Sequence, residues 1–410
     1  MTWLQWDWRR TSVPSSNREI QMQSTRSYPV CPESEILSLI DMPNVPVHCN
    51  VLWPTHAAAL AAPRGDIHLG YFPACGHVYN LKFDPSLMEY TQEYENSLHF
   101  SPRFQEYATT LADGLVAKYN LKDKDIVEIG AGKGDFLIML CAKYGNRGWG
   151  YDPSYVPEEG YTAPNVTFIQ DFYSEKYTDQ KADLIVCRHV LEHIEDPDAF
   201  VAQVRRAVGE RKDTIVFFEV PNSLWTLRQL GIWDIIYEHC SYFSPTSLAQ
   251  VFRRNGFRVL HVDQVFGGQF LTIEAIPEDD PPGEDDSAEL SALLDDARAF
   301  ADNYREKHDY WRKTLERLAS LGKRGVVWGA GSKGVTFLNA LADSRSIEYI
   351  VDINPRKQAK HVAGTGQLIV PPEFLSEMRP DFVIIMNTNY REEIDQTLRN
   401  LGVFAEILVA

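Results

Sequence analysis

The stretch DIVEIGAGKGDFLIML, residues 125–140, has the pattern of a strand, a tight turn and a helix. Its first five residues form a short, largely apolar run that contains Glu128, and Gly130, Gly132 and Gly134 follow. Glycines permit a tight turn and let a ligand approach the backbone at the start of the following helix. We therefore predict an α/β unit that binds a nucleotide-like ligand at this turn.

The segments that follow repeat this alternation. The next predicted strand, in RGWGYDPS, ends at Asp152, about 20 residues beyond the glycines, where an acid can bind ribose hydroxyls. Asp171 lies in FIQDFY, and the later strand in ADLIVCRHVLEHIEDP (residues 182–197) has polar residues at its carboxyl end. Strands alternating with helices predict a parallel sheet with its binding edge at the carboxyl ends of the strands.

This order of features resembles a class I S-adenosylmethionine (SAM) methyltransferase. The resemblance implies a Rossmann-like domain in which the three glycines lie against the amino acid part of SAM, with Glu128 nearby. Asp152 would bind the ribose and Asp171 the adenine amino group, and we add Arg188 as a cofactor contact. NAD binding is the alternative, which Glu128 within the strand and the segment CRHVLEHI disfavour.

A second glycine-rich turn occurs in RGVVWGAGSKGVTFLNAL, residues 324–341, and IEYIVDINP supplies the next strand, ending at Asp352. Alone this half-sheet would suggest a dinucleotide oxidoreductase. The rest of the chain is too short for a separate domain that binds a hydride acceptor. We expect the two units to share one substrate, with Gly331 and Lys333 as acceptor contacts.

Both units together resemble the three-domain nucleotide-sugar C-methyltransferases. The resemblance spans residues 28–410 and is most specific in PACGHVYN, YEHCSYFS, GAGSKGVTFLN and VDINPRKQ. It implies a small irregular N-terminal domain of the zinc-binding type, a central SAM domain and a C-terminal Rossmann-like domain. The implied reaction is C-methylation of a small carbonyl-bearing or nucleotide-linked metabolite. O- or N-methylation of a natural product, and a non-catalytic binding protein, are the alternatives.

The segment IWDIIYEHCSYFS, residues 232–244, carries the candidate proton-transfer groups. The resemblance places the general base at His239 and its orienting partner at Glu238. A histidine suits this task because its pKa lies near working pH. A purely structural pair bonded to neighbouring backbone is the alternative. His189 is the reserve base, and we expect His193 to pack at a helix start.

The acceptor contacts and the metal site depart from the family pattern. We expect Tyr94, Tyr237 and Asn222 to contact the acceptor, although Ile236 occupies a family tyrosine position, which puts a deoxysugar in doubt. The zinc motifs are reduced to CPES and FPAC, and two missing thiolates leave an open, weak site. We therefore predict no metal ligands and a lobe held by apolar contacts.

The organisation expected along the chain has five parts. A long amphipathic helix should begin the last part and end at Gly322, since its apolar residues recur at helical spacing. The parts are a tail (1–27), a small N-terminal domain (28–108), the methyltransferase domain (109–276), an acidic linker (277–286), and the helix with the C-terminal domain (287–410).

The composition of the chain limits the classes of partner that it can bind. The 410 residues are 44% hydrophobic and carry a net charge of −17, which disfavours nucleic acid and anionic membranes as main partners. No apolar stretch approaches a membrane span or a secretory signal. The six scattered cysteines are typical of a reducing compartment. We expect a cytoplasmic monomer or homodimer that acts on a small-molecule acceptor.

Overall fold

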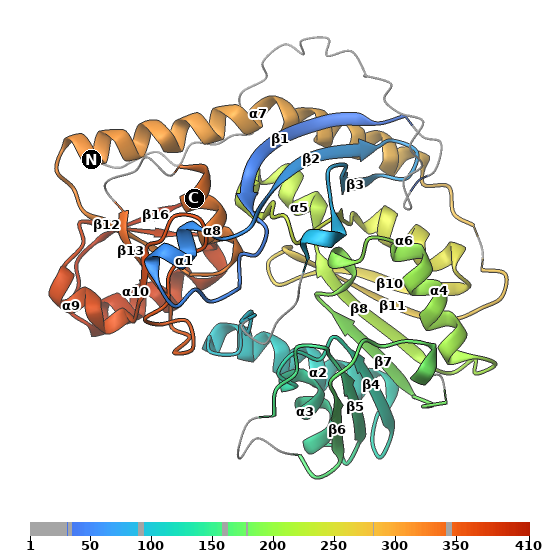
Figure 1. Cartoon of the computed structure of the whole chain (residues 1–410). Helices are drawn as coiled ribbons and strands as arrows, with labels where there is room; N and C mark the ends of the chain where they lie inside the picture. The colour runs from blue at the N-terminus through green and yellow to red at the C-terminus, as the bar shows by residue number, and fades with distance from the viewer. Residues whose placement is uncertain are drawn as a thin grey trace.

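The chain folds around three β-sheets (Figure 1). The computed structural model describes residue 31 and residues 35–88, 94–157, 163–177, 179–281, 283–341 and 347–410. The expected tail, residues 1–27, lies outside the described residues. Within the described ranges, no helix combines the length and apolar composition needed to cross a bilayer.

The central sheet has seven strands in the order β10-β11-β8-β7-β4-β5-β6. The pairs from β6 to β8 are parallel, whereas β11 runs antiparallel to β8 and to β10. The chain order reverses beside β4, so a binding crevice is expected at the carboxyl ends of β4 and β7. The strands are β4 (Asp125–Ile129), β5 (Arg147–Tyr151), β6 (Val166–Ile169), β7 (Leu184–Arg188), β8 (Ile215–Pro221), β10 (Phe257–Val265) and β11 (Phe270–Pro277).

Helices cover both faces of this sheet. Side chains alternate between the faces of a strand, so Ile126 packs with α2 (Pro102–Tyr119) and α3 (Asp135–Ala142). Its neighbour Val127 points to the opposite face and packs in the core that α4 (Pro197–Val208) and α6 (Pro245–Arg254) complete. Both faces of the sheet are thus buried, so we expect the side chains that contact a ligand to lie at the strand ends.

The N-terminal region contains a four-stranded antiparallel sheet, more regular than the short strands and loops expected there. Its order is β1-β2-β3-β9. The first three strands are β1 (Leu37–Pro46), β2 (Arg64–Phe72) and β3 (His77–Asn80), with α1 (His56–Leu60) between the first two. The fourth strand, β9 (Ser241–Tyr242), belongs to the YEHCSYFS segment, which ties that segment to the N-terminal sheet.

The C-terminal sheet is entirely parallel, in the order β14-β13-β12-β15-β16. As expected, β12 leads through the second glycine-rich turn into α8. The elements are β12 (Gly325–Trp328), α8 (Ser332–Ala340), β13 (Ile347–Val351), β14 (Leu368–Val370), α9 (Leu375–Met378), β15 (Phe382–Ile385), α10 (Arg391–Asn400) and β16 (Glu406–Val409).

The long helix α7 (Ser287–Ser320) is observed as one uninterrupted element and spans the molecule above the sheets (Figure 1). It ends just before Gly322, whose φ of +66° suits a helix end. Trp311 of α7 packs edge to face on Phe337 of α8, with ring centroids 5.3 Å apart. Its apolar side chains share one core with the N-terminal sheet and the segment 224–242, which fixes these parts relative to one another.

Short elements complete the chain. They are α5 (Ser223–Arg228) and single 3-10 turns at Pro85–Leu87, Glu175–Tyr177, Leu191–His193, Ile232–Asp234, Pro372–Phe374 and Thr388–Tyr390. The turn Leu191–His193 follows β7 directly and therefore lies at the carboxyl edge of the central sheet. The predicted domain boundaries stay predictions, because the shared core joins the parts on both sides of them.

Candidate active site

A cavity of about 320 Å³ lies where the three sheets meet. It opens at the carboxyl ends of the central strands and faces the glycine-rich turn of the C-terminal sheet. Its polar lining comes from all three parts of the chain. The lining includes Asn50, Tyr94, His189, Glu192, His193, Asp234, His239, Gln269, Gly331, Ser332, Lys333 and Asn354.

Two histidines meet in this cavity. The rings of His193 and His239 are edge to face, with centroids 4.8 Å apart. His193 Nδ1 donates a hydrogen bond to the carbonyl of Glu238 at 2.9 Å, so its Nε2 carries the lone pair when the ring is neutral. His193 was expected to pack at a helix start, and the structure instead places it in the lining of the cavity.

The backbone around His239 explains why its ring reaches the cavity. A turn at Tyr237 and Glu238 is closed by a hydrogen bond from His239 N to the carbonyl of Ile236 at 3.3 Å. The chain then enters β9, which pairs with β3. Burial lowers the pKa of His239 to about 4, so its imidazole is neutral near pH 7 and able to accept a proton.

The side chain of Glu238 has partners other than His239, and its role as the orienting partner of His239 stays a prediction. Its side chain is fully buried, and Oε2 accepts a hydrogen bond from Cys49 N at 3.1 Å while Oε1 lies 3.8 Å from His48 Nδ1. Burial opposes its ionisation, but His48, His193 and the Cys49 N–H together lower its pKa. The turn sends these adjacent side chains in different directions, so Glu238 joins the loop before β9 to the N-terminal region.

His189, the reserve base, is committed to an ion-pair network. Its Nε2 lies 2.7 Å from Glu219 Oε1 and its Nδ1 lies 3.7 Å from Glu192 Oε1. Burial would lower its pKa, but the two carboxylates raise it to about 9. The ring is thus protonated near pH 7. A protonated ring cannot accept a proton, so the expected reserve role conflicts with this environment.

Arg188 belongs to the same network. Its guanidinium lies 2.9 Å from Glu219 and over the ring of Phe136, 4.1 Å from the centroid. Tyr107 donates its hydroxyl to the same carboxylate. These groups hold the pKa of Glu219 at about 2 despite its burial. The guanidinium therefore neutralises a buried acid, and the expected contact of Arg188 with the cofactor stays a prediction.

The first glycine-rich turn is open to a ligand. Gly130, Gly132 and Gly134 have φ values of +71°, +55° and +89°, which favour glycine over other residues. A Cβ at Gly132 would meet nothing within 4 Å, so the backbone there is uncovered. Asp152 Oδ2 accepts the Gly132 N–H at 2.8 Å, which brings the acid to the edge of the turn.

Glu128 lies beneath this turn. It is buried at the end of β4, and burial raises its pKa to about 8. Its Oε2 has no hydrogen-bond partner among the described residues, although a buried carboxylate normally has one. Asp171 is further out, where it accepts hydrogen bonds from Tyr177 Oη at 2.6 Å and Lys176 Nζ at 3.0 Å.

The expected acceptor contacts divide into two groups. Tyr94, Gly331 and Lys333 line the cavity. Asn222 instead caps α5 with Oδ1 and donates Nδ2 to the carbonyl of Gly268 at 2.7 Å. The hydroxyl of Tyr237 accepts Asp84 N at 2.9 Å, away from the cavity. Local backbone groups thus occupy polar atoms of both side chains, and their expected contacts with the acceptor stay predictions.

The remnants of the zinc motifs lie at one end of the N-terminal sheet. A hydrogen bond between the Cys31 and Cys75 thiols, together with burial, raises the pKa of Cys75. Phe72 is fully buried in the apolar core, as expected for a lobe held by apolar contacts. The predicted loss of zinc stays a prediction.

Comparison with known proteins decides the class of enzyme. The methyltransferase-domain family matches residues 101–262, and the C-methyltransferase C-terminal domain matches residues 284–404. The chain is a SAM-dependent methyltransferase with a C-methyltransferase C-terminal domain. This methyltransferase is 27% identical over 307 residues to "C-methyltransferase NovU" of Streptomyces niveus, across 70% of this chain and 72% of that relative.

Solved structures resemble a smaller part of the methyltransferase. A SAM-dependent methyltransferase from Listeria monocytogenes has 14% identity and a TM-score of 0.33, and covers 42% of this chain and 99% of its own. Magnesium protoporphyrin IX methyltransferase from Synechocystis, solved with S-adenosylhomocysteine, has 20% identity and a TM-score of 0.33 and covers 43% and 84%.

The glycine-rich turn fits SAM, the methyl donor of the enzyme. SAM carries an ammonium group, and the unpartnered Oε2 of buried Glu128 is the kind of acceptor that such a cation requires. The open backbone at Gly132 leaves room for the amino acid part, and Asp152 lies beside it for the ribose. These individual contacts stay predictions.

The sequence did not lead us to Glu192, and it did not lead us to place His193 in the lining of a cavity. Both lie in the 3-10 turn after β7, at the sheet edge where the polar ends of parallel strands gather. That position was a usable signal. Asp234 and Trp225 were also missed; they hold Lys333, with Nζ 3.0 Å from Asp234 Oδ1 and 5.0 Å from the Trp225 ring centroid. Neither contact is visible in the local sequence.

Proposed function

We propose that this methyltransferase alkylates a carbon beside a carbonyl group in a small acceptor bound in the cavity, and that His239 removes the C–H proton. The observation that carries the proposal is the neutral, cavity-lining imidazole of His239 at the edge of the methyl-donor sheet. A base of this kind fits carbon methylation, because a carbon nucleophile must first lose a proton.

The chain contributes alignment and proton transfer. SAM, when bound, would supply an electrophilic methyl group and would keep the bonding electron pair on its sulfur. His239 takes the proton from the acceptor carbon, and the electron pair of that C–H bond forms the new bond to the methyl carbon. The imidazolium formed on His239 lies near the Glu192 carboxylate, which stabilises the positive charge.

The C-terminal turn suits an anionic part of the acceptor. Gly331 and Ser332 begin α8 at the cavity wall, and Lys333 Nζ lies there between Asp234 and the Trp225 ring. A helix N-terminus with a nearby ammonium attracts phosphate. This favours a nucleotide-linked acceptor over a neutral natural product. Tyr94 lies on the same side of the cavity, because Asn50 Nδ2 donates to both the Tyr94 hydroxyl at 3.4 Å and Ser332 Oγ at 3.1 Å.

The test combines product analysis with isotope exchange. Carbonyl acceptors, free and nucleotide-linked, are incubated with [methyl-¹³C]SAM, and NMR establishes the atom that carries the new methyl group. A bond to oxygen or nitrogen would overturn carbon methylation. Separately, the acceptor is incubated in D₂O with S-adenosylhomocysteine. The proposal expects exchange at the acceptor carbon with the wild-type enzyme and its loss in His239→Ala.

A further inference from the structure

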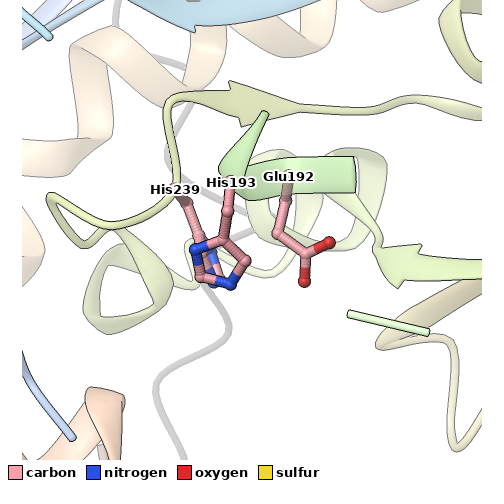
Figure 2. A group of neighbouring side chains, drawn as sticks. All are labelled: Glu192, His193 and His239. Carbon is pink, nitrogen blue, oxygen red and sulfur yellow. The ribbon is translucent and has the colours of Figure 1, made fainter. Parts of the chain in front are cut away.

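Three side chains in the cavity wall have the composition of a metal site. One ligand atom from each of Glu192, His193 and His239 lies within 4.8 Å of the others. Glu192 and His193 project from the 3-10 turn after β7, and His239 approaches from the loop before β9 (Figure 2). Two imidazoles and one carboxylate form a common ligand set for divalent transition metals.

Glu192 supplies an independent observation that points to a cation. It is only 1% exposed, and its Oε2 has no hydrogen-bond partner in the part of the chain that the structure describes. A buried carboxylate oxygen without a donor is costly, and a bound cation would remove this cost.

Groups behind the three side chains hold them in place. The Nδ1–H of His193 is bound to the carbonyl of Glu238, so the opposite ring nitrogen carries the lone pair. His189 lies between Glu192 and Glu219, 3.7 Å from the former and 2.7 Å from the latter. Metal-binding histidines and carboxylates are usually oriented by such outer partners.

We propose that Glu192, His193 and His239 bind a divalent transition-metal ion of the Zn²⁺ type, with a coordination position open to the cavity. Bringing the ligand atoms to coordination distance requires them to close around the ion. The consequence for activity rests on the proposed function. A metal bound through His239 takes the lone pair that would accept the acceptor proton, so metal binding and catalysis exclude each other.

Cobalt titration tests the site directly. The full chain, freed of metal with a chelator, is titrated with Co²⁺, whose visible absorption reports coordination. We expect one ion per chain and no intense near-ultraviolet thiolate band, since the ligands are nitrogen and oxygen. Substitutions Glu192→Gln, His193→Ala and His239→Ala should each weaken binding at least ~100-fold, more than the usual loss of an outer partner.

Matched controls come from exposed residues of the same types. Glu195→Gln, close by in sequence, and His261→Ala on β10 should leave Co²⁺ affinity unchanged. Absence of a cobalt signal, a thiolate band that disappears in the double variant Cys31→Ser and Cys75→Ser, or full affinity in Glu192→Gln would overturn the site. Anomalous scattering from Zn²⁺-soaked wild-type crystals decides it if a variant does not fold.

Activity separates the two proposals. Zn²⁺ should inhibit methyl transfer in proportion to its occupancy of the site, and a chelator should restore turnover. Inhibition that is absent at full occupancy would overturn the mutual exclusion. Cobalt binding is measured without an acceptor, so it tests the metal site independently of the proposed reaction. If His239→Ala retained turnover, the proposal that His239 is the base would be wrong, whereas the metal site would still stand on the cobalt result.

Discussion

The rings of His193 and His239 meet edge to face in the cavity, with centroids 4.8 Å apart. The two residues come from different segments, one after a strand of the central sheet and one before a strand of the N-terminal sheet. Their meeting therefore depends on how the two sheets are placed. Because we propose His239 as the base, its removal should lower turnover more than the removal of its neighbours.

The first prediction concerns that removal. His239→Ala should lower turnover at least ~100-fold, the lower range for loss of a positioned general base. SAM affinity should stay near the wild-type value, because His239 lies outside the glycine-rich turn. Steady-state kinetics and SAM titration check both parts, with His261→Ala as the control. Wild-type turnover in His239→Ala would leave the segment with a structural role alone.

The second prediction concerns Glu128. The pKa of its carboxyl group is about 8 in the folded protein, against an ordinary value of 4.5. Glu128 therefore keeps its proton in the folded protein between pH 4.5 and about 8. The ammonium group of SAM favours the ionised carboxylate. SAM binding between about pH 5 and 8 should therefore release a proton, and affinity should rise with pH over that window.

Calorimetry of SAM binding in buffers of different ionisation enthalpy measures this proton. Glu128→Gln should abolish the buffer dependence and weaken binding. A buffer-dependent signal of the wild-type size in Glu128→Gln would assign the proton to another group.

The third prediction concerns the stability of the buried network. Glu219→Gln removes the charge that pairs with Arg188 and His189, and breaking a buried pair costs about 3–5 kcal/mol of unfolding free energy. The pKa of Glu219 is lowered to about 2 in the folded protein. Its contribution is thus present above pH 4.5 and is lost as pH falls toward 2.

Urea unfolding of Glu219→Gln and the wild type at pH 7 and at pH 3 tests this. The difference between the two proteins should shrink at the lower pH. A constant difference would contradict the assignment of the low pKa to Glu219.

The fourth prediction separates a structural residue from an acceptor contact. Asn222→Ala removes a helix cap and leaves the Gly268 carbonyl without its donor, so unfolding free energy should fall by about 1–2 kcal/mol. The KM for the acceptor should not change. A raised acceptor KM at unchanged stability would instead support a contact between Asn222 and the acceptor.

The fifth prediction concerns Lys333. Replacing it with Gln removes the cation beside the start of α8, and the acceptor KM should rise at least ~10-fold if the acceptor carries phosphate, since a charged hydrogen bond contributes about 1.5–3 kcal/mol. SAM affinity should be unchanged. An acceptor KM that stays the same would indicate that the acceptor is not held at this turn.

The two glycine-rich units could be predicted because their signals are local. In each, an apolar run, glycines at fixed offsets and a following helix occur within one short stretch, and the structure places β4 with α3 and β12 with α8 there. The long helix α7 was equally visible, since its apolar spacing depends only on its own residues.

The candidate site was harder to predict because tertiary contacts decide it. Glu238 and His239 are adjacent in sequence, but the turn between them separates their side chains, and Glu238 bonds to Cys49 instead. His193 was misjudged because its neighbour His239 arrives only through the pairing of β9 with β3. Neither relationship has a local sequence pattern.

We expect the pairing of β9 with β3 to form later in folding than the glycine-rich turn of the central sheet. The glycine-rich turn of the central sheet is built from residues close together in sequence, whereas Val78 and Tyr242 must meet across a long stretch of chain. Contacts between distant residues form slowly, because the loop between them must close first. In refolding, the protein should regain its affinity for SAM before it regains turnover.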